Sequence, residues 1–162
     1  MTPEFFIEFA LTPALRLLPP NMSTTPARAM VIAICLQESQ MENRKQLGGG
    51  PARGYAQFEQ GGGVRGVLSH PASKPHIQAV LSALDYDPLS DPAKCYAAIE
   101  HNDILAAAFA RLLLWTLPDP LPARGEMGEG WSQYIAAWRP GKPHRASWDK
   151  FFNDAWGLVV RE

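Results

Sequence analysis

The sequence predicts a mainly α-helical domain with one small extended element. Apolar residues recur at intervals of three and four along most of the chain, which is the period of an amphipathic helix. A capping residue stands directly before proline at four points, and this pairing is typical of helix starts because proline fits the first helical turn. The four pairs are Thr2-Pro3, Thr12-Pro13, Thr25-Pro26 and Asp91-Pro92.

Composition indicates one soluble globular domain over residues 1–162. Apolar residues make up 46% of the chain and charged residues 19%, and this length can bury a sizeable core. A net charge of −1 argues against a nucleic-acid-binding surface. No apolar run approaches the roughly 18 to 20 residues of a membrane span, and the acidic start Met-Thr-Pro-Glu predicts no signal peptide.

Apolar periodicity and the Pro and Gly residues that interrupt it set the expected helices. Asn102 or Asp103 is expected to cap the helix predicted at 104–116. That stretch is apolar nearly all round, so it is expected to be central and to pack against the helix at 26–39. The predicted helices span residues 3–10, 13–18, 26–39, 76–84, 92–100, 104–116, 131–138 and 145–156.

Glu38 is the strongest candidate for a catalytic residue. It shares a helical face with Val31, Ile34 and Cys35 and lies in the last turn of the predicted helix. Burial and the negative end of the helix dipole both disfavour a charged carboxylate, so the pKa of Glu38 is expected to be raised. A carboxyl group that stays protonated near neutral pH can act as a general acid. The alternative is a solvated glutamate at a frayed helix end.

Two glycine clusters bracket the segment 53–60, which is the expected extended element. If it is extended, Tyr55, Gln57 and Glu59 lie on one side and line the cleft, while Ala56 and Phe58 face the core. Gly54 is expected to let a substrate approach the backbone closely. The alternative is a glycine-rich surface turn without chemistry.

Glu38-Ser39, followed by Gly54-Tyr55-Ala56-Gln57, resembles the Glu-Ser … Gly-Leu-Met-Gln pattern of soluble lytic transglycosylases and goose-type lysozymes. The string from Gly50 to Glu59 is similar to versions in phage-encoded lysozyme-like proteins. The resemblance implies a lysozyme-like helical fold, with Glu38 as the catalytic acid and Gln57 in the cleft beside it. The Ala-Tyr-Asn-Ala-Gly segment of the family has only a stand-in here, at 134–138.

The resemblance implies cleavage of the β-1,4 bond between N-acetylmuramic acid and N-acetylglucosamine in peptidoglycan. If Glu38 is the only carboxyl group that the reaction needs, a lytic transglycosylase is favoured. If Glu59 also faces the cleft, it can act as the general base of a hydrolase. The alternatives are a non-catalytic virion or tail structural protein on the same scaffold and a saccharide-binding module. The expected substrate-binding residues are Ser39, Tyr55, Gln57, Glu59 and Tyr134.

Aromatic and cationic residues within 131–143 are further candidates for packing in the core or for contact with a ligand. Trp131, Tyr134 and Trp138 share a helical face, where the tryptophans are expected to pack in the core and the Tyr134 hydroxyl to reach a buried carboxylate or a sugar. The cationic loop 139–143 is expected to form one rim of a saccharide groove.

No histidine or cysteine spacing predicts a metal site, and no cofactor is expected. Free cysteines and the absence of an export signal suggest synthesis in a host cytoplasm and action at the cell wall, after carriage in a phage particle or release through a holin.

Overall fold

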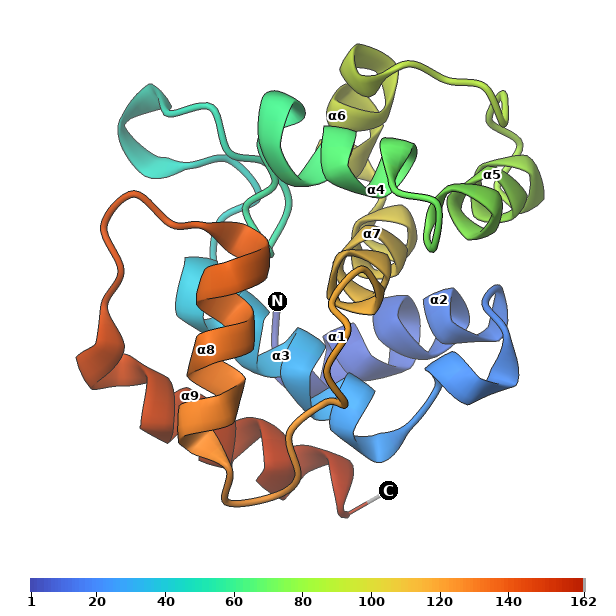
Figure 1. The fold of residues 1–162 in the computed structure, drawn as a ribbon. Helices are drawn as coiled ribbons and strands as arrows, with labels where there is room; N and C mark the ends of the chain where they lie inside the picture. The colour runs from blue at the N-terminus through green and yellow to red at the C-terminus, as the bar shows by residue number, and fades with distance from the viewer. Residues whose placement is uncertain (162) are drawn as a thin grey trace.

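The computed structural model describes residues 1–161 as a mainly α-helical domain with essentially no strands (Figure 1). Within these residues the β pairing consists of two isolated bridges, Lys45 with Arg53 and Arg53 with Phe58. The prediction of a mainly helical domain is confirmed. The predicted extended element at 53–60 is wrong, because its residues form a tight turn that is described with the site below.

The N-terminal helices form one continuous run instead of two separate helices. α1 (Pro3–Phe6) passes through a π-helical turn (Ile7–Leu11) directly into α2 (Thr12–Arg16). The helix predicted at 13–18 is present as α2, but Thr12 does not cap it, because the chain enters α2 from the π-helical turn without a break. The wider turn accommodates the proline ring of Pro13 without ending the helix, and the Thr12 hydroxyl accepts a hydrogen bond from Arg28 instead of capping.

α3 (Thr25–Ser39) carries Glu38 in its last turn and is buried along most of its length. Its cap is Thr24, whose hydroxyl accepts the Ala27 N–H, so the predicted cap at Thr25 is displaced by one residue. Every residue from Ala29 to Leu36 is buried. Glu38 therefore stands where the helix leaves the core.

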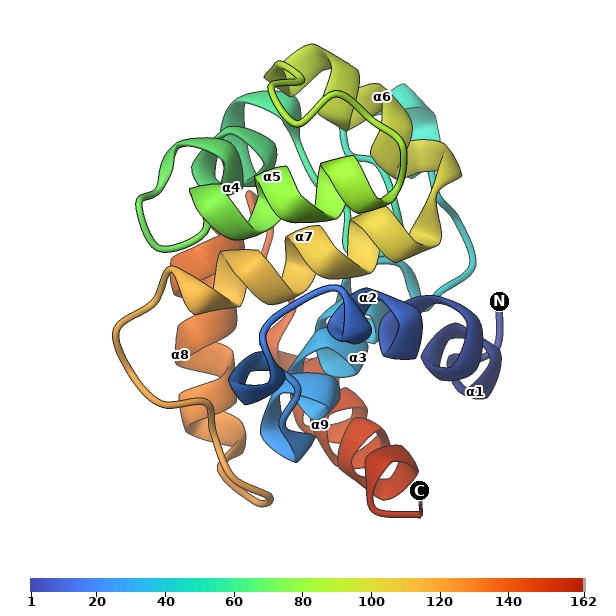
Figure 2. The ribbon, with the colours of Figure 1, turned by 90° about the vertical axis from the view of Figure 1, so that its right-hand side faces the viewer.

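The helices predicted in the middle of the chain are present as α5 (Lys74–Ala83), α6 (Pro92–His101) and α7 (Asp103–Trp115), and a short helix, α4 (Arg65–Ser69), precedes them. Asn102 caps α7 through its Oδ1, which accepts the Leu105 N–H at 3.0 Å. All residues of α7 from Leu105 to Leu114 are buried. Figure 2 shows α7 between α5 and the N-terminal helices, which confirms its predicted central position.

α8 (Met127–Trp138) and α9 (Arg145–Val159) complete the fold. α8 begins four residues before the predicted start at 131, although this first turn contains two glycines. Gly130 serves packing: a Cβ there would lie 2.7 Å from the Phe152 ring. α9 lies along α3 and contacts it more extensively than α7 does, a pairing that the sequence did not predict (Figure 1).

The cysteines and the helix lengths within residues 1–161 can be compared with the sequence predictions. Cys35 and Cys95 are both buried and unpaired, as predicted. Across this part of the chain, none of the helices combines the length and apolar character that a bilayer span requires.

Candidate active site

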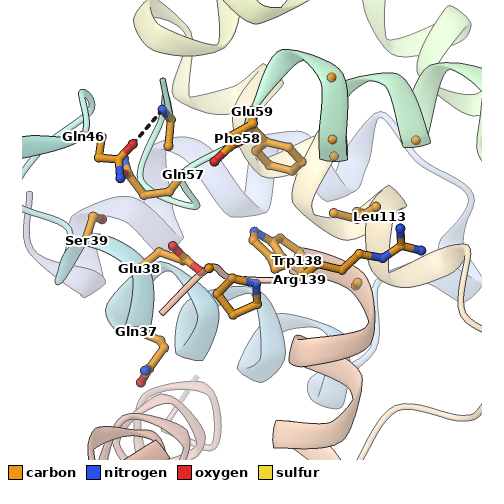
Figure 3. Close-up of a pocket in the computed structure, with 18 of the residues that line it drawn as sticks. Gln37, Glu38, Ser39, Gln46, Gln57, Phe58, Glu59, Leu113, Trp138 and Arg139 are labelled. Atoms are coloured by element: carbon orange, nitrogen blue, oxygen red, sulfur yellow. Dashed lines mark hydrogen bonds between the residues drawn. The ribbon is translucent and has the colours of Figure 1, made fainter. Parts of the chain in front are cut away.

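A cleft of about 1250 Å³ runs past the C-terminal end of α3. Figure 3 shows Glu38 on one wall and Gln57 and Glu59 on the other. Glu38 is half-buried and lines this cleft, together with its neighbour Ser39. Trp138, at the end of α8, contributes to the same cavity. The structure thus brings together elements from three distant parts of the sequence around the predicted acid.

The electrostatic surroundings of Glu38 favour a protonated carboxyl group near neutral pH. The pKa of Glu38 is raised from 4.5 to about 7, chiefly by burial and to a smaller extent by the negative charge of Glu59. Tyr134 acts in the opposite direction, since its hydroxyl donates a hydrogen bond of 2.5 Å to Glu38 Oε1. Burial is the largest of these effects, so the group is divided between its acid and base forms at physiological pH.

Tyr134 reaches Glu38 from the buried side of the cleft. The side chain is 2% exposed and stacks on Trp148, with ring centroids 5.2 Å apart. Burial and the nearby Glu38 charge both raise the pKa of Tyr134, so the phenol keeps its proton and remains a donor. Of the two partners predicted for this hydroxyl, a carboxylate or a sugar, the structure pairs it with the carboxylate. Tyr134 does not line the cleft itself.

Ser39 connects the end of α3 to the turn that carries Gln57. Its hydroxyl lies 2.7 Å from the Tyr55 carbonyl oxygen and 3.2 Å from the Cys35 carbonyl oxygen. The same oxygen accepts the Met41 N–H at 3.2 Å. These bonds occupy the hydroxyl, so Ser39 positions the turn beside Glu38 rather than offering a free group to a ligand.

The segment predicted as extended is a tight turn closed by reciprocal backbone hydrogen bonds. Arg53 N–H donates to Phe58 O at 2.9 Å, and Phe58 N–H donates to Arg53 O at 2.7 Å. Gly54 and Gln57 both have positive φ angles, +74° and +53°, which turn the chain back on itself. The alternating pattern of a strand therefore does not decide which side chains face the cleft.

Tyr55 is the predicted cleft residue that the turn moves elsewhere. Its ring is 4% exposed and packs edge-on against Phe6, and the Arg44 guanidinium lies over it. It does not line the cleft. The prediction that Tyr55 lines the cleft is therefore wrong, because the turn directs its side chain into the core. Gln57 and Glu59 do line the cleft, as predicted.

Two further hydrogen bonds hold the turn in place. Gln57 Nε2 donates to Gly54 O at 2.8 Å, so one end of the Gln57 amide is fixed by its own turn. Trp138 Nε1 donates to Ala56 O at 2.8 Å and ties the turn to α8. Phe58 is buried against Phe109 and Trp138. The position of Gln57 opposite Glu38 therefore depends on α8 as well as on α3.

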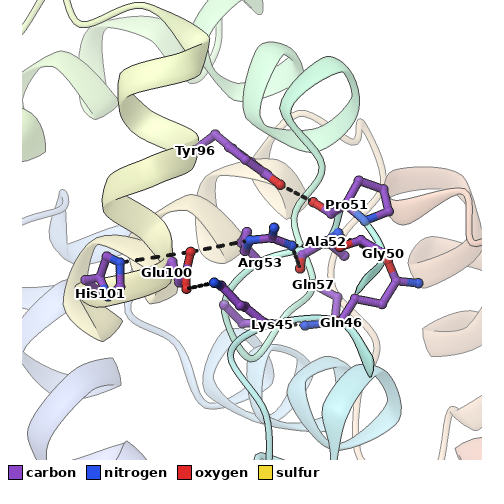
Figure 4. Close-up of polar contacts among 11 residues, drawn as sticks. Lys45, Gln46, Gly50, Pro51, Ala52, Arg53, Gln57, Tyr96, Glu100 and His101 are labelled. Atoms are coloured by element: carbon purple, nitrogen blue, oxygen red, sulfur yellow. Dashed lines mark hydrogen bonds and ion pairs between the residues drawn. The ribbon is translucent and has the colours of Figure 1, made fainter. Parts of the chain in front are cut away.

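The loop that follows α3 forms another part of the wall and is anchored to α6 (Figure 4). Lys45 Nζ lies 3.3 Å from one carboxylate oxygen of Glu100, and Arg53 Nε lies 3.4 Å from the other. The Tyr96 hydroxyl donates to Pro51 O at 2.5 Å. The sequence predicts no role for this loop. Its amide Gln46, which lines the cleft, was missed, and no pattern in the sequence distinguishes it.

Left-handed backbone conformations concentrate at the cleft. The non-glycine residues with positive φ within residues 1–161 are Gln40, Met41, Gln57, Asp85 and Arg139. Three of them, Gln40, Gln57 and Arg139, line the cleft. The conformation costs a non-glycine residue on the order of 1 kcal/mol, and such strain gathers at functional sites. This clustering supports the cleft as the functional part of the molecule without reference to any motif.

Within the described residues, no group of three or more His, Cys, Asp or Glu side chains is arranged to hold a metal ion. Comparisons of the chain with protein families, curated proteins and solved structures find no match. The lysozyme-like resemblance therefore stays a prediction.

Proposed function

We propose that the protein is a peptidoglycan-cleaving muramidase of lysozyme-like architecture that acts on the β-1,4 bond between N-acetylmuramic acid and N-acetylglucosamine. One observation carries the proposal: a carboxyl group with a pKa of about 7 lies in the wall of a cleft of about 1250 Å³. That volume exceeds the roughly 300 to 1,000 Å³ of sites for small ligands, so it suits several sugar units of a glycan strand.

Glu38 acts as the general acid in the first step. Because Tyr134 donates to Oε1, the proton of the neutral carboxyl group is left on Oε2. This proton passes to the glycosidic oxygen as the bond to the anomeric carbon breaks. The Tyr134 hydroxyl stabilises the carboxylate that forms, because a hydrogen bond to an ionised acceptor is stronger than one to a neutral acceptor.

Gln57 supports this chemistry by holding the sugar. Its Nε2 already donates to Gly54 O, so its amide oxygen is oriented by the turn. The free amide oxygen can accept a hydrogen bond from an acetamido N–H or a sugar hydroxyl. Because an amide neither gains nor loses a proton in the ordinary pH range, Gln57 can bind substrate equally well across it.

A lytic transglycosylase is the favoured second step. The 6-hydroxyl of muramic acid gives its proton to the Glu38 carboxylate and attacks the anomeric carbon, which closes an anhydro ring and needs no second carboxylate. Hydrolysis is the second candidate, because Glu59 also lines the cleft and its charge raises the pKa of Glu38. As base, Glu59 would activate a water, with inversion at a carboxyl separation of roughly 6.5–9.5 Å.

Mass analysis of digested peptidoglycan tests the proposal. Anhydro products lack one water relative to reducing-end products, so the two chemistries are separated in one measurement. We expect anhydro products and a Glu59→Gln variant that keeps most of its rate. Reducing-end products, with a loss of roughly 10² or more in Glu59→Gln, would select hydrolysis.

The absence of any soluble fragment from wild-type digests would refute the proposed enzymatic activity. It would favour the alternative, a virion or tail structural protein that keeps the scaffold without turnover. Under the proposal, the partners are glycan strands of the cell wall, reached from a phage particle or through a holin.

A further inference from the structure

Three cations at the cleft have no partner of their own. Arg65, Arg139 and Lys142 line the cleft and are exposed, and within residues 1–161 their side chains make no ion pair or hydrogen bond. By contrast, Lys45, which also lines the cleft, is paired with Glu100. We call Arg65, Arg139 and Lys142 the cationic rim.

The cationic rim is drawn from two segments of the chain that the fold brings next to each other. Arg139 ends α8, and Arg65 directly follows the segment Gln60–Val64, which α8 contacts. Figures 1 and 2 agree in placing the end of α8 next to the start of α4. Lys142 lies three residues beyond Arg139, in the loop that leads to α9. The rim therefore combines residues that are far apart in the sequence around one cleft.

Arg139 occupies a backbone position that favours a different residue. It ends α8 with φ +49°, in the left-handed region where helices commonly end in glycine. An arginine is strained there, and its side chain lines the cleft. Strain held at a cleft residue is the pattern expected where the side chain has a functional role.

We propose that the cationic rim binds the free carboxylates of peptidoglycan, on the acidic peptide stems attached to muramic acid and on lactyl groups that carry no stem. The proposal rests on the proposed function and specifies its substrate class: glycan strands that carry free carboxylates, in preference to neutral polymers of N-acetylglucosamine. Guanidinium groups suit this role, because they match the planar, bidentate geometry of a carboxylate. With a net charge of −1, the protein as a whole does not attract anions, so recognition is local to the rim.

The test measures binding with Glu38→Gln protein, so that no cleavage occurs during the titration. The probes are soluble peptidoglycan fragments with free carboxylates and the same fragments after chemical amidation of those carboxylates. We expect the free-acid fragments to bind at least about tenfold more tightly than the amidated ones at low salt. This figure assumes that each of the three cations strengthens binding by about two- to fivefold, as exposed ion pairs do. Adding Arg65→Gln, Arg139→Gly and Lys142→Gln should remove this preference.

Arg124→Gln is the matched control, because Arg124 is also exposed, likewise makes no side-chain ion pair within residues 1–161, and does not line the cleft. It should keep the full preference. Arg139→Gly should fold at least as well as its parent, because glycine relieves the strained conformation. Thermal unfolding of each variant separates lost binding from lost structure.

Equal affinity for free and amidated fragments would overturn the inference, as would a preference that survives the triple replacement or a failure to bind either fragment. The proposed function fails differently. Wild-type protein that binds the free-acid fragments preferentially but releases no products would refute catalysis and leave the cationic rim in place.

Discussion

At the scale of single residues, Glu38 is subject to opposing effects, and burial is the larger. Burial and Glu59 favour the protonated form, while the Tyr134 hydroxyl favours the charged form. The resulting pKa of about 7 lets one carboxyl group donate a proton and then recover it at neutral pH. Tyr134 therefore tunes the acid and also fixes which oxygen carries the proton.

Tyr134→Phe should raise the pKa of Glu38, because it removes the hydrogen bond that stabilises the carboxylate. The expected shift is about one unit, from the worth of a hydrogen bond to a charged group. Titration of the Glu38 carboxyl carbon by NMR in both proteins measures it directly. An unchanged or lower pKa in Tyr134→Phe would show that this hydrogen bond does not stabilise the ionised form in solution.

At the scale of elements, the turn between Arg53 and Phe58 determines what faces the cleft. Gly54 is required there for two structural reasons: its φ of +74°, and the proximity of Ile99 Cγ2, 2.9 Å from where a Cβ would lie. Its predicted role, close approach of substrate to the backbone, is therefore replaced by a role in packing. Ser39 and Trp138 then hold the turn from two different helices.

Gly54→Ala should lower the free energy of unfolding by about 2–4 kcal/mol, from left-handed strain and overpacking together. Gly125→Ala is the matched control, since Gly125 has φ +88° but open space around its Cα. Only strain acts there, so the expected loss is about 1–2 kcal/mol. Denaturant unfolding of both variants makes the comparison, and equal losses would mean that contact with Ile99 is unimportant.

At the scale of the whole molecule, the raised pKa of Glu38 should make stability depend on pH. The folded pKa of Glu38 is about 7 and its ordinary value is 4.5, so the folded protein binds this proton more tightly than the unfolded chain. The stabilisation is fully present below pH 4.5 and is lost as the pH rises through 7. Above pH 7 the fold holds a half-buried negative charge.

Glu38→Gln should therefore be more stable than wild type at pH 8 by about 1–3 kcal/mol, with the difference shrinking toward zero below pH 4.5. The amide cannot ionise, yet its oxygen can still accept the Tyr134 hydrogen bond. Free energies of unfolding across this pH range provide the measurement. A difference that does not change with pH would contradict the raised pKa.

Much of the fold is predictable because local signals agree with the tertiary structure. The all-round apolar pattern of α7 predicts its burial, and Asn102 marks its start. Prediction failed where tertiary packing reverses the usual local meaning of a residue. A glycine usually disfavours a helix, but Gly130 lies within α8 and makes room for Phe152. A proline after threonine usually marks the start of a separate helix, but Pro13 follows a π-helical turn in a continuous helical run.

The candidate site was predictable in its acid but only partly in its surroundings. Glu38, Gln57 and Glu59 line the cleft as expected, because a helix end and a glycine-flanked segment both leave the core there. Tyr55 was misplaced because alternation over so few residues fits a turn as well as a strand. The Tyr134 bond to Glu38 spans 96 residues, so the sequence offered it only as one of two options.

The most direct test of Glu38 as the catalytic acid is the rate at which purified peptidoglycan is solubilised by wild type and by Glu38→Gln at pH 7. We expect steady release by wild type and none detectable by the variant, while its circular dichroism and cooperative unfolding show an intact fold. Wild-type rates in a folded Glu38→Gln variant would contradict the role assigned to this carboxyl group.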